Sequence, residues 1–295
     1  MQKITPHLWF DKEAKEAAEF YVSVFGGNSH SGKITTLHET PSGDTPIAPF
    51  TLLGHEFMSM SAGPLFKFNP SVSFIVAFKS KEEVDAIWKK LSAGGQALME
   101  LGEYPFNKRY GWTADKYGLS WQVLLDDGHY QYRQPITPTL LFVGEVCGKA
   151  EEAMNFYASI FPKGNVGEIA RYGARMAPEK EGTVMHGSFF LAGQEFFAMD
   201  SAHEHKFKFN EAISFMVYCD DQAEIDRYWE KLSAVPEAEQ CGWLKDKFGL
   251  SWQIVSTAMG EMLQKGTPEQ IDRVTQAFLP MKKIIIADLE KAYEG

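Results

Sequence analysis

Residues 111–123 read GWTADKYGLSWQV and residues 242–254 read GWLKDKFGLSWQI, so the chain carries one segment twice, 131 positions apart. Each copy predicts a first strand at Gly-Trp, a tight turn at Asp-Lys-aromatic-Gly, and a second strand in which Ser, Trp, Gln and an aliphatic residue alternate. A β-hairpin that recurs after nearly half of the 295 residues indicates an internal repeat. The fold is therefore that of one unit of about half the chain, used twice.

The sequence before the first hairpin predicts two successive β-α-β-β-β modules. The first module opens with a strand at residues 4–10 and an amphipathic helix at 11–25, and continues with short strands at residues 33–38, 50–53 and 56–61. The second module opens at the alternating residues 71–78. Its helix is capped at Ser80 by a capping box, and three further strands end in the hairpin.

The second half repeats this order, with one loss. Residues 136–142 match residues 4–10, and residues 207–210 match residues 66–69. Leu91 and Gly111 are 20 positions apart, but their counterparts Leu232 and Gly242 are only 10 apart, so the second half lacks most of one strand and its loop.

Polar residues 126–134 are typical of a linker between the halves. This predicts a first domain at residues 1–128 and a second domain at 135–257. Residues 258–295 have no counterpart in the first half and predict a helical clasp, with Thr267 as a helix cap and Pro268 at the first helical position.

Composition excludes several classes of function. A net charge of -10 and a pI near 5.4 leave no basic stripe for nucleic acid. The first residues have no apolar signal region and no apolar run could span a bilayer, so we expect a cytoplasmic protein with no membrane partner. Three cysteines without a Cys-x-x-Cys pair argue against a disulfide framework and against a thiolate zinc site.

Further motifs accompany the duplicated hairpin in a fixed order. They are Pro6-His7-Leu8-Trp9-Phe10, Glu19-Phe20-Tyr21, Val24-Phe25-Gly26 and the tail segments 281–284 and 289–292. With them the chain resembles the vicinal-oxygen-chelate superfamily of glyoxalases, bleomycin resistance proteins and extradiol dioxygenases, and within it the PhnB-like proteins. The resemblance spans both halves. It implies an α+β fold of tandem domains, in each of which two β-α-β-β-β modules form a curved mixed sheet, or cup.

The resemblance also indicates where a metal would be held. Catalytic members of the superfamily bind a divalent metal through His or Glu side chains on the first and last strands of each module. The corresponding positions here are Thr5, a residue near Ser59, Ser73 and Gln122 in the first half, and Thr137, a residue near Ala198, Ser214 and Gln253 in the second half. Hydroxyls and amides are weak ligands for transition metals, so we predict no metal site and no cofactor.

A polar cup with hydrogen-bonding groups remains. By alternation His7 and Trp9 share the face of Thr5, and an aromatic ring beside hydroxyls and amides is a normal lining for a small, partly apolar ligand. His7 could equally be a hydrogen-bonded histidine of the wall. The predicted ligand-binding residues are Thr5, His7, Trp9, Ser73, Gln122, Thr137, Ser214 and Gln253, and we expect the first-half cup to be the site.

Three functions stay open. The first is metal-free binding of a small metabolite. The second is a metal-dependent lyase, isomerase or dioxygenase with atypical ligands, such as His7 with Glu56 or Glu100. The third is a non-catalytic assembly module, for which a homodimer is one possibility. Relatives often carry the label of a ubiquinone-pathway methyltransferase, but the first strand runs into Asp11-Lys12-Glu13 and not into a Gly-rich cofactor turn. No motif here specifies a reaction.

Overall fold

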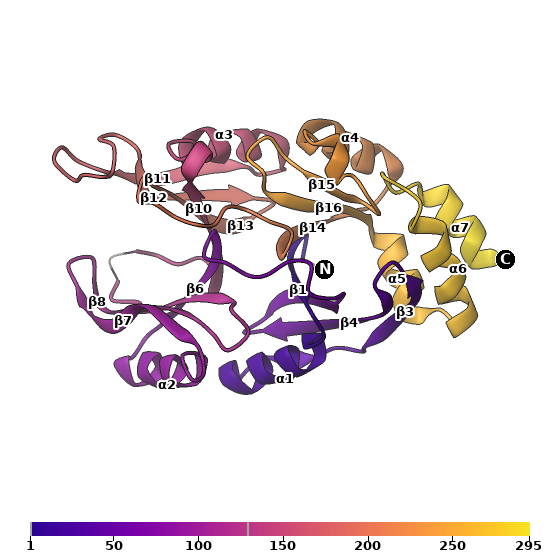
Figure 1. Cartoon of the computed structure of the whole chain (residues 1–295), viewed down its shortest axis with the longest axis horizontal. Helices are drawn as coiled ribbons and strands as arrows, with labels where there is room; N and C mark the ends of the chain where they lie inside the picture. The colour runs from indigo at the N-terminus through magenta and orange to yellow at the C-terminus, as the bar shows by residue number, and fades with distance from the viewer. Residues whose placement is uncertain (1, 129) are drawn as a thin grey trace. The chain divides into compact units, whose positions relative to one another are not determined.

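The computed structural model describes residues 2–128 and 130–295 and divides the chain into two compact units. Unit 1 comprises residues 1–67 and 210–295, and unit 2 comprises residues 68–209. Each unit contains one mixed eight-stranded sheet, with helices packed on its outer face (Figure 1). The predicted α+β class is confirmed.

Unit 1 is built from the first and the last modules of the chain, followed by the tail. Its sheet has the order β15-β16-β14-β1-β5-β4-β2, and β3 pairs with β4. The elements are β1 (Ile4–Phe10), α1 (Ala14–Phe25), β2 (His30–Ser31), β3 (Thr35–Thr40), β4 (Gly43–Leu52), β5 (His55–Ser61), β14 (Ile213–Cys219), α4 (Gln222–Leu232), β15 (Trp243–Lys245), β16 (Ser251–Ser256), α5 (Thr257–Lys265), α6 (Pro268–Phe278) and α7 (Ile286–Glu294), with a 3-10 turn at Pro236–Ala238.

Unit 2 is built from the two middle modules. Its sheet has the order β11-β12-β13-β10-β6-β9-β8-β7. The elements are β6 (Val72–Phe78), α2 (Lys81–Leu91), β7 (Gln96–Tyr104), β8 (Asn107–Ala114), β9 (Ser120–Leu125), β10 (Ile136–Val143), α3 (Ala150–Ile160), β11 (Asn165–Arg171), β12 (Val184–Leu191) and β13 (Gln194–Ser201), with a 3-10 turn at Gly144–Val146.

The predicted domains at residues 1–128 and 135–257 leave open whether modules pair within a half or between halves, and in the structure they pair between halves. Strand β1 pairs antiparallel with β14, and β6 pairs antiparallel with β10, so each sheet joins a module of one half to a module of the other. The physical reason is that β1 and β10 share the pattern Ile-Thr-Pro-x-Leu-x-Phe. Either strand offers the same alternation of faces to a partner, so the pattern alone does not select the partner.

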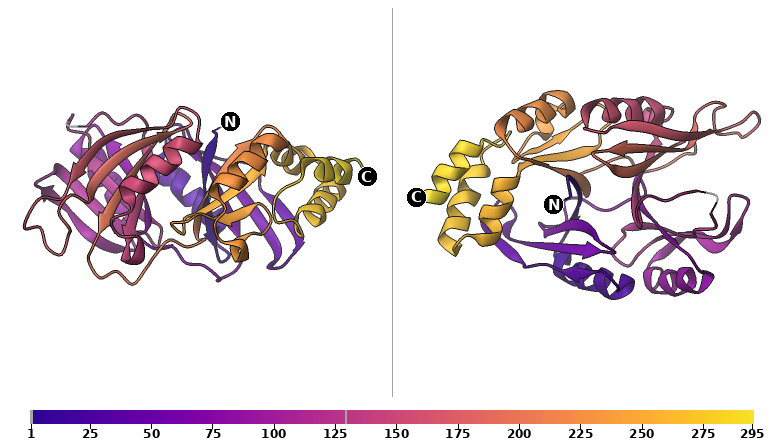
Figure 2. Two further views of the ribbon diagram at one scale, coloured as in Figure 1. Left: turned by 90° about the horizontal axis from the view of Figure 1, so that it is seen from above. Right: turned by 180° about the vertical axis from the view of Figure 1, so that it is seen from behind.

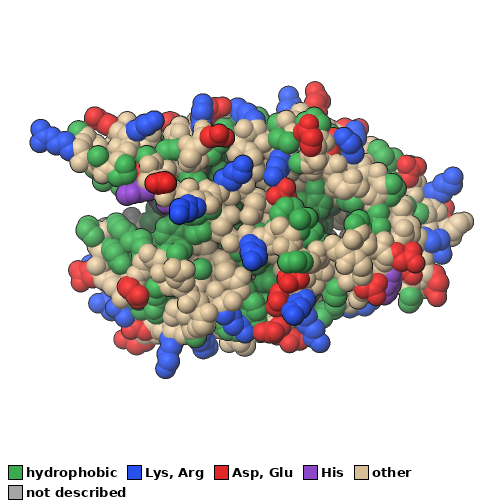
Figure 3. All heavy atoms as spheres, viewed as in Figure 1, with side chains coloured by type: hydrophobic (Ala, Val, Ile, Leu, Met, Phe, Trp, Pro, Cys, Tyr) green, Lys and Arg blue, Asp and Glu red, His purple; other side chains and the backbone are tan. Residues whose placement is uncertain are grey.

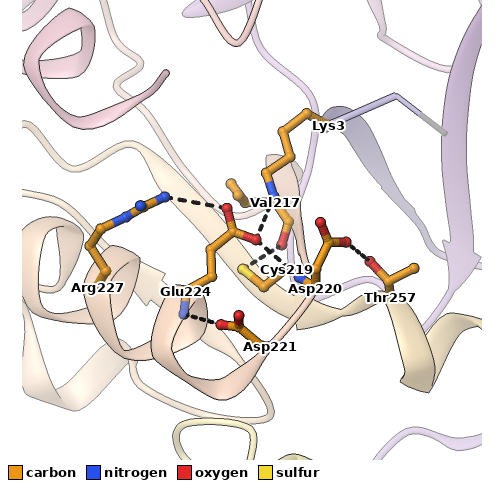
Figure 4. A network of polar contacts seen from close by, with 8 residues as sticks. All are labelled: Lys3, Val217, Cys219, Asp220, Asp221, Glu224, Arg227 and Thr257. Atoms are coloured by element: carbon orange, nitrogen blue, oxygen red, sulfur yellow. Dashed lines mark hydrogen bonds and ion pairs between the residues drawn. The ribbon is translucent and has the colours of Figure 1, made fainter.

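A polar network secures this exchange in unit 1 (Figure 4). Lys3, just before β1, donates from Nζ to Glu224 Oε2 on α4 at 2.7 Å, and Arg227 donates to the other carboxylate oxygen at 3.3 Å. The backbone N–H of Glu224 donates in turn to the capping residue Asp221 at 2.8 Å. The start of the first module is thus tied to the first turn of the last module's helix.

The duplicated segment forms the predicted hairpins β8–β9 and β15–β16, and a buried aspartate organises each turn. Asp115 accepts hydrogen bonds from the N–H groups of Tyr117 and Leu119 and from Trp121 Nε1, at 2.8 to 3.1 Å. Asp246 accepts the equivalent three bonds in the second copy. The carboxylate closes the turn and anchors a tryptophan that is fully buried on the helix side of the sheet.

The tail lies against both modules of unit 1 (Figure 2). Thr267 caps α6 in a capping box with Gln270, as predicted, and α6 ends at Phe278 before Pro280. Gln276 Nε2 donates to the carbonyl of His38 in the first module, while Gly242 and Gln222 of the last module bond to residues 282–286. Helix α5 was not predicted as a separate helix. None of the described helices is long and apolar enough to cross a membrane.

Candidate functional site

Each sheet has an inner face, defined here as the face opposite its outer helices. In unit 1, the side chains of Thr5, His7 and Trp9 on β1 point to this face. The alternate side chains of Ile4, Leu8 and Phe10 point to the helix side, where they are buried. The register places Ser214 of β14 opposite His7, and Met216 opposite Thr5. Met216 in turn faces Gln253 of β16. A polar row therefore crosses three strands of unit 1.

Two side chains of this face are buried without a polar partner. Thr5 is 2% exposed and His7 is 4% exposed, and no described group is hydrogen-bonded to Thr5 Oγ1 or to His7 Nδ1. Burial lowers the pKa of His7 to about 3, so its imidazole is neutral at physiological pH. A neutral imidazole nitrogen and a hydroxyl are therefore both free to bond a ligand.

Aromatic rings stand beside these polar groups. The ring of Trp243 on β15 meets the ring of His7 edge-on, with centroids 5.3 Å apart, and lies 6.1 Å from Trp9. The ring of Trp9 also packs edge-on against the ring of Phe66, with centroids 5.1 Å apart. Its Nε1 donates to the carbonyl of Gly63 at 2.8 Å. On the other side of β1, Met58 lies opposite His7. The inner face of unit 1 is thus a polar centre with an aromatic and thioether surround.

The inner face of unit 2 brings Ser73, Gln122 and Thr137 together. Ser73 faces Thr139 of β10, and Ile75 faces both Thr137 and Gln122 on the two neighbouring strands. Gln122 Nε2 donates to Ser73 Oγ at 2.9 Å, and Gln122 Oε1 accepts from the phenol of Tyr110 at 2.7 Å. Both ends of the Gln122 amide are therefore used within the protein. Thr137 Oγ1 is buried without a partner.

The segment between the halves fills much of this second face. Tyr130 and Tyr132 pack against Phe197 of β13, with ring centroids 5.4 and 6.2 Å away. The hydroxyl of Tyr130 donates to Glu195 Oε1 at 2.7 Å, and the backbone N–H of Arg133 donates to Glu195 Oε2. Glu195 is completely buried. The predicted linker therefore covers unit 2 with its own side chains.

The eight predicted ligand-binding residues consequently fall into two groups that differ from the expected halves. Thr5, His7, Trp9, Ser214 and Gln253 share the inner face of unit 1, whereas Ser73, Gln122 and Thr137 share that of unit 2. Of the residues expected in the first-half cup, Thr5 and His7 therefore belong to unit 1, and Ser73 and Gln122 belong to unit 2. The missed residues are Trp243, which aligns with Trp112, and Tyr110, which lies two positions before Trp112 at the start of the hairpin.

The two approximate positions near Ser59 and Ala198 lie on the helix side. Ser59 is fully buried and its hydroxyl donates to the carbonyl of Ala48 at 2.7 Å, beside α1. Ala198 pairs with Leu140, which also faces the helices. The inner-face residues beside them are Met58 and Met60 in unit 1 and Phe197 and Met199 in unit 2.

The donor set of unit 1 does not fit a divalent metal ion of the kind held by catalytic relatives. The positions in question offer hydroxyls from Thr5 and Ser214, an amide from Gln253 and the thioether of Met58, with His7 as one imidazole. Neutral oxygens and thioethers are poor partners for hard or borderline divalent ions. No group of three or more His, Cys, Asp or Glu side chains suited to a metal occurs within residues 2–128 and 130–295.

The atypical ligands considered for a metal are also dispersed. Glu56 shares the inner face of β5 with Met58, and its carboxylate accepts from the N–H of Gln2 at 2.9 Å. Glu100 is exposed on β7 and belongs to unit 2, whereas His7 belongs to unit 1. His203 and His205 lie in a loop, where His205 contacts Ser201 Oγ at 2.9 Å. His55 is half-buried.

The remaining surface and the cysteines add no chemistry to this site. Basic and acidic side chains are interspersed on the face seen in Figure 3. Cys219 is fully buried, and burial raises the pKa of its thiol to about 12, so it is a residue of the core.

Comparison with solved structures defines the class of fold. A glyoxalase I mutant from Zea mays superposes with a TM-score of 0.52 at 10% identity, over 87% of this chain and 95% of that one. A second glyoxalase I mutant from Zea mays gives a TM-score of 0.51 at 11% identity, over 86% and 94%. The two sheets with their helices thus form the glyoxalase, or vicinal-oxygen-chelate, fold in tandem.

Sequence comparison then defines the family. The profile of the 3-demethylubiquinone-9 3-methyltransferase family matches residues 2–124 and again residues 134–255. The chain belongs to this family, whose PhnB protein from Bacillus cereus is 42% identical over 42% of this chain and 99% of that one, with a TM-score of 0.39. Protein PA1353 from Pseudomonas aeruginosa is 22% identical over 42% and 98%, with a TM-score of 0.37. No curated protein matched the chain.

Proposed function

We propose that the protein binds a small, partly apolar metabolite on the inner face of unit 1, without a divalent metal ion, in the cytoplasm. The observation that carries the proposal is the pair of buried, unpartnered atoms Thr5 Oγ1 and His7 Nδ1 on a face lined by Trp9 and Trp243. A buried polar atom without a partner costs about 1 to 3 kcal/mol. A ligand that bonds to these atoms recovers that cost, and the aromatic rings bury its apolar part.

The family name describes methyl transfer, but the residues of this chain do not support that activity. Common methyltransferases hold their nucleotide cofactor at a Gly-rich turn between a parallel strand and a helix. Here β1 leads into α1 through Asp11, Lys12 and Glu13. We therefore propose binding, and leave methyl transfer out of the proposed function.

Thermal-shift screening with aromatic and dicarbonyl metabolites tests the proposal. We expect at least one compound to raise the melting temperature of the wild type and to lose this effect in Trp9→Ala. The matched control is Leu141→Ala, which alters the equivalent position of unit 2 and should keep the effect. Failure of every compound to stabilise the wild type would count against binding.

Elemental analysis of protein purified without a histidine tag tests the metal-free part. We expect no stoichiometric manganese, zinc or nickel, because the inner face of unit 1 offers one imidazole among neutral oxygens and thioethers. A stoichiometric divalent metal that is lost in His7→Thr would overturn this part and favour a metal-dependent lyase, isomerase or dioxygenase.

A further inference from the structure

The repeat provides an internal comparison between Gln253 of unit 1 and Gln122 of unit 2. Both glutamines occupy the third position of the Ser-Trp-Gln strand. Each donates from Nε2 to a buried serine hydroxyl at 2.9 Å, to Ser214 in unit 1 and to Ser73 in unit 2. The serine fixes the amide in the same orientation in both units, so the two Oε1 atoms are presented to equivalent places.

In unit 2 that place is taken by a phenol. The hydroxyl of Tyr110 donates to Gln122 Oε1 at 2.7 Å, and Tyr110 is 6% exposed. Burial raises the pKa of Tyr110 well above its ordinary value, so the phenol remains a donor. The ring of Tyr110 packs in an apolar cluster with Ile75, Leu124 and Phe197.

In unit 1 the phenol is missing. The residue that precedes Gly-Trp is Cys241 in place of Tyr110, and its N–H and Sγ are bonded to the carbonyls of Met281 and Leu279 in the tail. Within residues 2–128 and 130–295, no group donates a hydrogen bond to Gln253 Oε1. Gln253 is nevertheless only 6% exposed. The same oriented acceptor is thus presented in both units, but only unit 2 supplies its own donor.

We infer that unit 1 binds an aromatic ring bearing a hydroxyl group, and that this hydroxyl donates to Gln253 Oε1 as Tyr110 does to Gln122. This inference rests on the proposed function, whose binding face it shares. Trp243 pairs with Gln253 across the β15–β16 hairpin and provides an aromatic wall for the ring. Gln253 and Thr5 lie two strand spacings apart, about 10 Å, so a second polar substituent could reach Thr5 or His7.

Three ligands that share a methyl-substituted benzene ring test the inference on the full chain by isothermal titration calorimetry. They are p-cresol, 4-methylanisole and toluene, which share the ring and differ in the ability to donate a hydrogen bond. We expect p-cresol to bind at least tenfold more tightly than 4-methylanisole. Because this comparison uses the wild type, it does not depend on the folding of a variant.

Two substitutions test whether Gln253 Oε1 is the atom that accepts the hydrogen bond from the hydroxyl of p-cresol. Gln253→Met conserves volume and removes the acceptor, so it should bring the affinity for p-cresol down to that for toluene. Gln122→Met makes the same change in unit 2, where Tyr110 already fills the place, and should leave the affinity for p-cresol unchanged.

The outcomes separate this inference from the proposed function. Equal affinity for p-cresol and 4-methylanisole, or unchanged p-cresol binding in Gln253→Met, overturns the phenol inference. If the three ligands still bind and lose affinity in Trp9→Ala, the proposed function stands without it. If none of the three binds, the phenol inference fails, while the metabolite screen above still decides the proposed function.

Discussion

Units 1 and 2 share a sheet topology but differ in what lies on the inner face. Unit 2 covers its face with the phenols of Tyr110, Tyr130 and Tyr132, and its buried groups Gln122 and Glu195 are hydrogen-bonded to two of them. In unit 1 the buried His7 Nδ1 and Thr5 Oγ1 have no described partner. Unit 2 therefore hydrogen-bonds Gln122 and Glu195 within the protein, whereas Thr137 in unit 2 and both Thr5 and His7 in unit 1 keep a buried atom without a described partner.

The origin of the difference is local. The long β7–β8 hairpin of unit 2 carries Tyr104 and Tyr110 over its face. In unit 1 the equivalent hairpin strand β15 has three residues, because the second half is shorter before Gly242. A segment shorter by ten residues, together with Cys241 in place of Tyr110, thus changes the side chains on one face while the hairpin partner strand remains.

The largest effect should be shared by the two units. Asp115→Ala and Asp246→Ala each leave three N–H donors without their acceptor, most of them buried, at a cost of about 1 kcal/mol or more per donor. We expect each to lower the free energy of unfolding by about 3 kcal/mol or more in urea titrations. A loss below 1 kcal/mol in one unit alone would show that the hairpins are not equivalent.

Removal of a buried carboxylate should distinguish the units. Glu195→Ala leaves the hydroxyl of Tyr130 and the N–H of Arg133 without their acceptor, so we expect a loss of about 2 to 3 kcal/mol in unfolding free energy. The matched change Glu56→Ala in unit 1 removes the acceptor of one backbone hydrogen bond, from the N–H of Gln2, and should cost about 1 kcal/mol. Equal losses would contradict the idea that the linker fills unit 2.

The loss of folding stability below neutral pH should depend on His7. In the folded protein burial holds the pKa of His7 near 3, whereas in the unfolded chain it lies near 6.5. Between these values unfolding takes up a proton, so stability is fully present above pH 6.5 and falls as the pH falls. At pH 5 this term amounts to about 2 kcal/mol relative to neutral pH.

The variant His7→Thr installs the residue that unit 2 has at position 139, and should remove this acid loss in melting curves between pH 5 and 7. His38→Thr is the control of opposite sign. A hydrogen bond to Asp44 raises the pKa of His38, so its removal should slightly deepen the acid loss. An unchanged pH dependence in His7→Thr would show that His7 is not buried as described.

The smallest stability effect concerns the two glutamines. Gln122→Met removes the hydrogen-bond partner of two buried hydroxyls, those of Tyr110 and Ser73. Gln253→Met removes the partner of one, that of Ser214. We expect Gln122→Met to be less stable than Gln253→Met by about 1 kcal/mol in urea unfolding. The reverse order would mean that Gln253 already has a donor within the protein.

Much of the fold could be predicted because the sequence contains an internal repeat, so each element is indicated by two copies. The repeated Asp-Lys-aromatic-Gly turn specified the hairpins, and the caps at Ser80 and Thr267 located two helices. Helix α5 falls within the predicted helical clasp at residues 258–295, but no separate helix was specified there, and Met259 is its one residue that is buried. The pairing of modules escaped because β1 and β10 carry the same alternating pattern.

The site could be predicted residue by residue but not as a set. Alternation correctly placed His7 and Trp9 with Thr5, since they lie on one strand. Ser214 and Gln253 reach the same face only because β14 pairs with β1 and β16 pairs with β14. This pairing is set by tertiary packing, which the local sequence pattern does not specify. The contrast between Tyr110 and Cys241 before Gly-Trp was the available sequence signal that the two faces differ.

Methyl NMR tests the central claim most directly. In protein labelled with ¹³C at the methionine methyl groups, Met58, Met60 and Met216 report the inner face of unit 1, and Met99 and Met199 report unit 2. Titration with p-cresol should produce saturable shifts of the unit 1 methyl signals while those of unit 2 stay in place. Shifts confined to Met99 and Met199, or none at all up to millimolar p-cresol, would contradict the claim that unit 1 holds the open binding face.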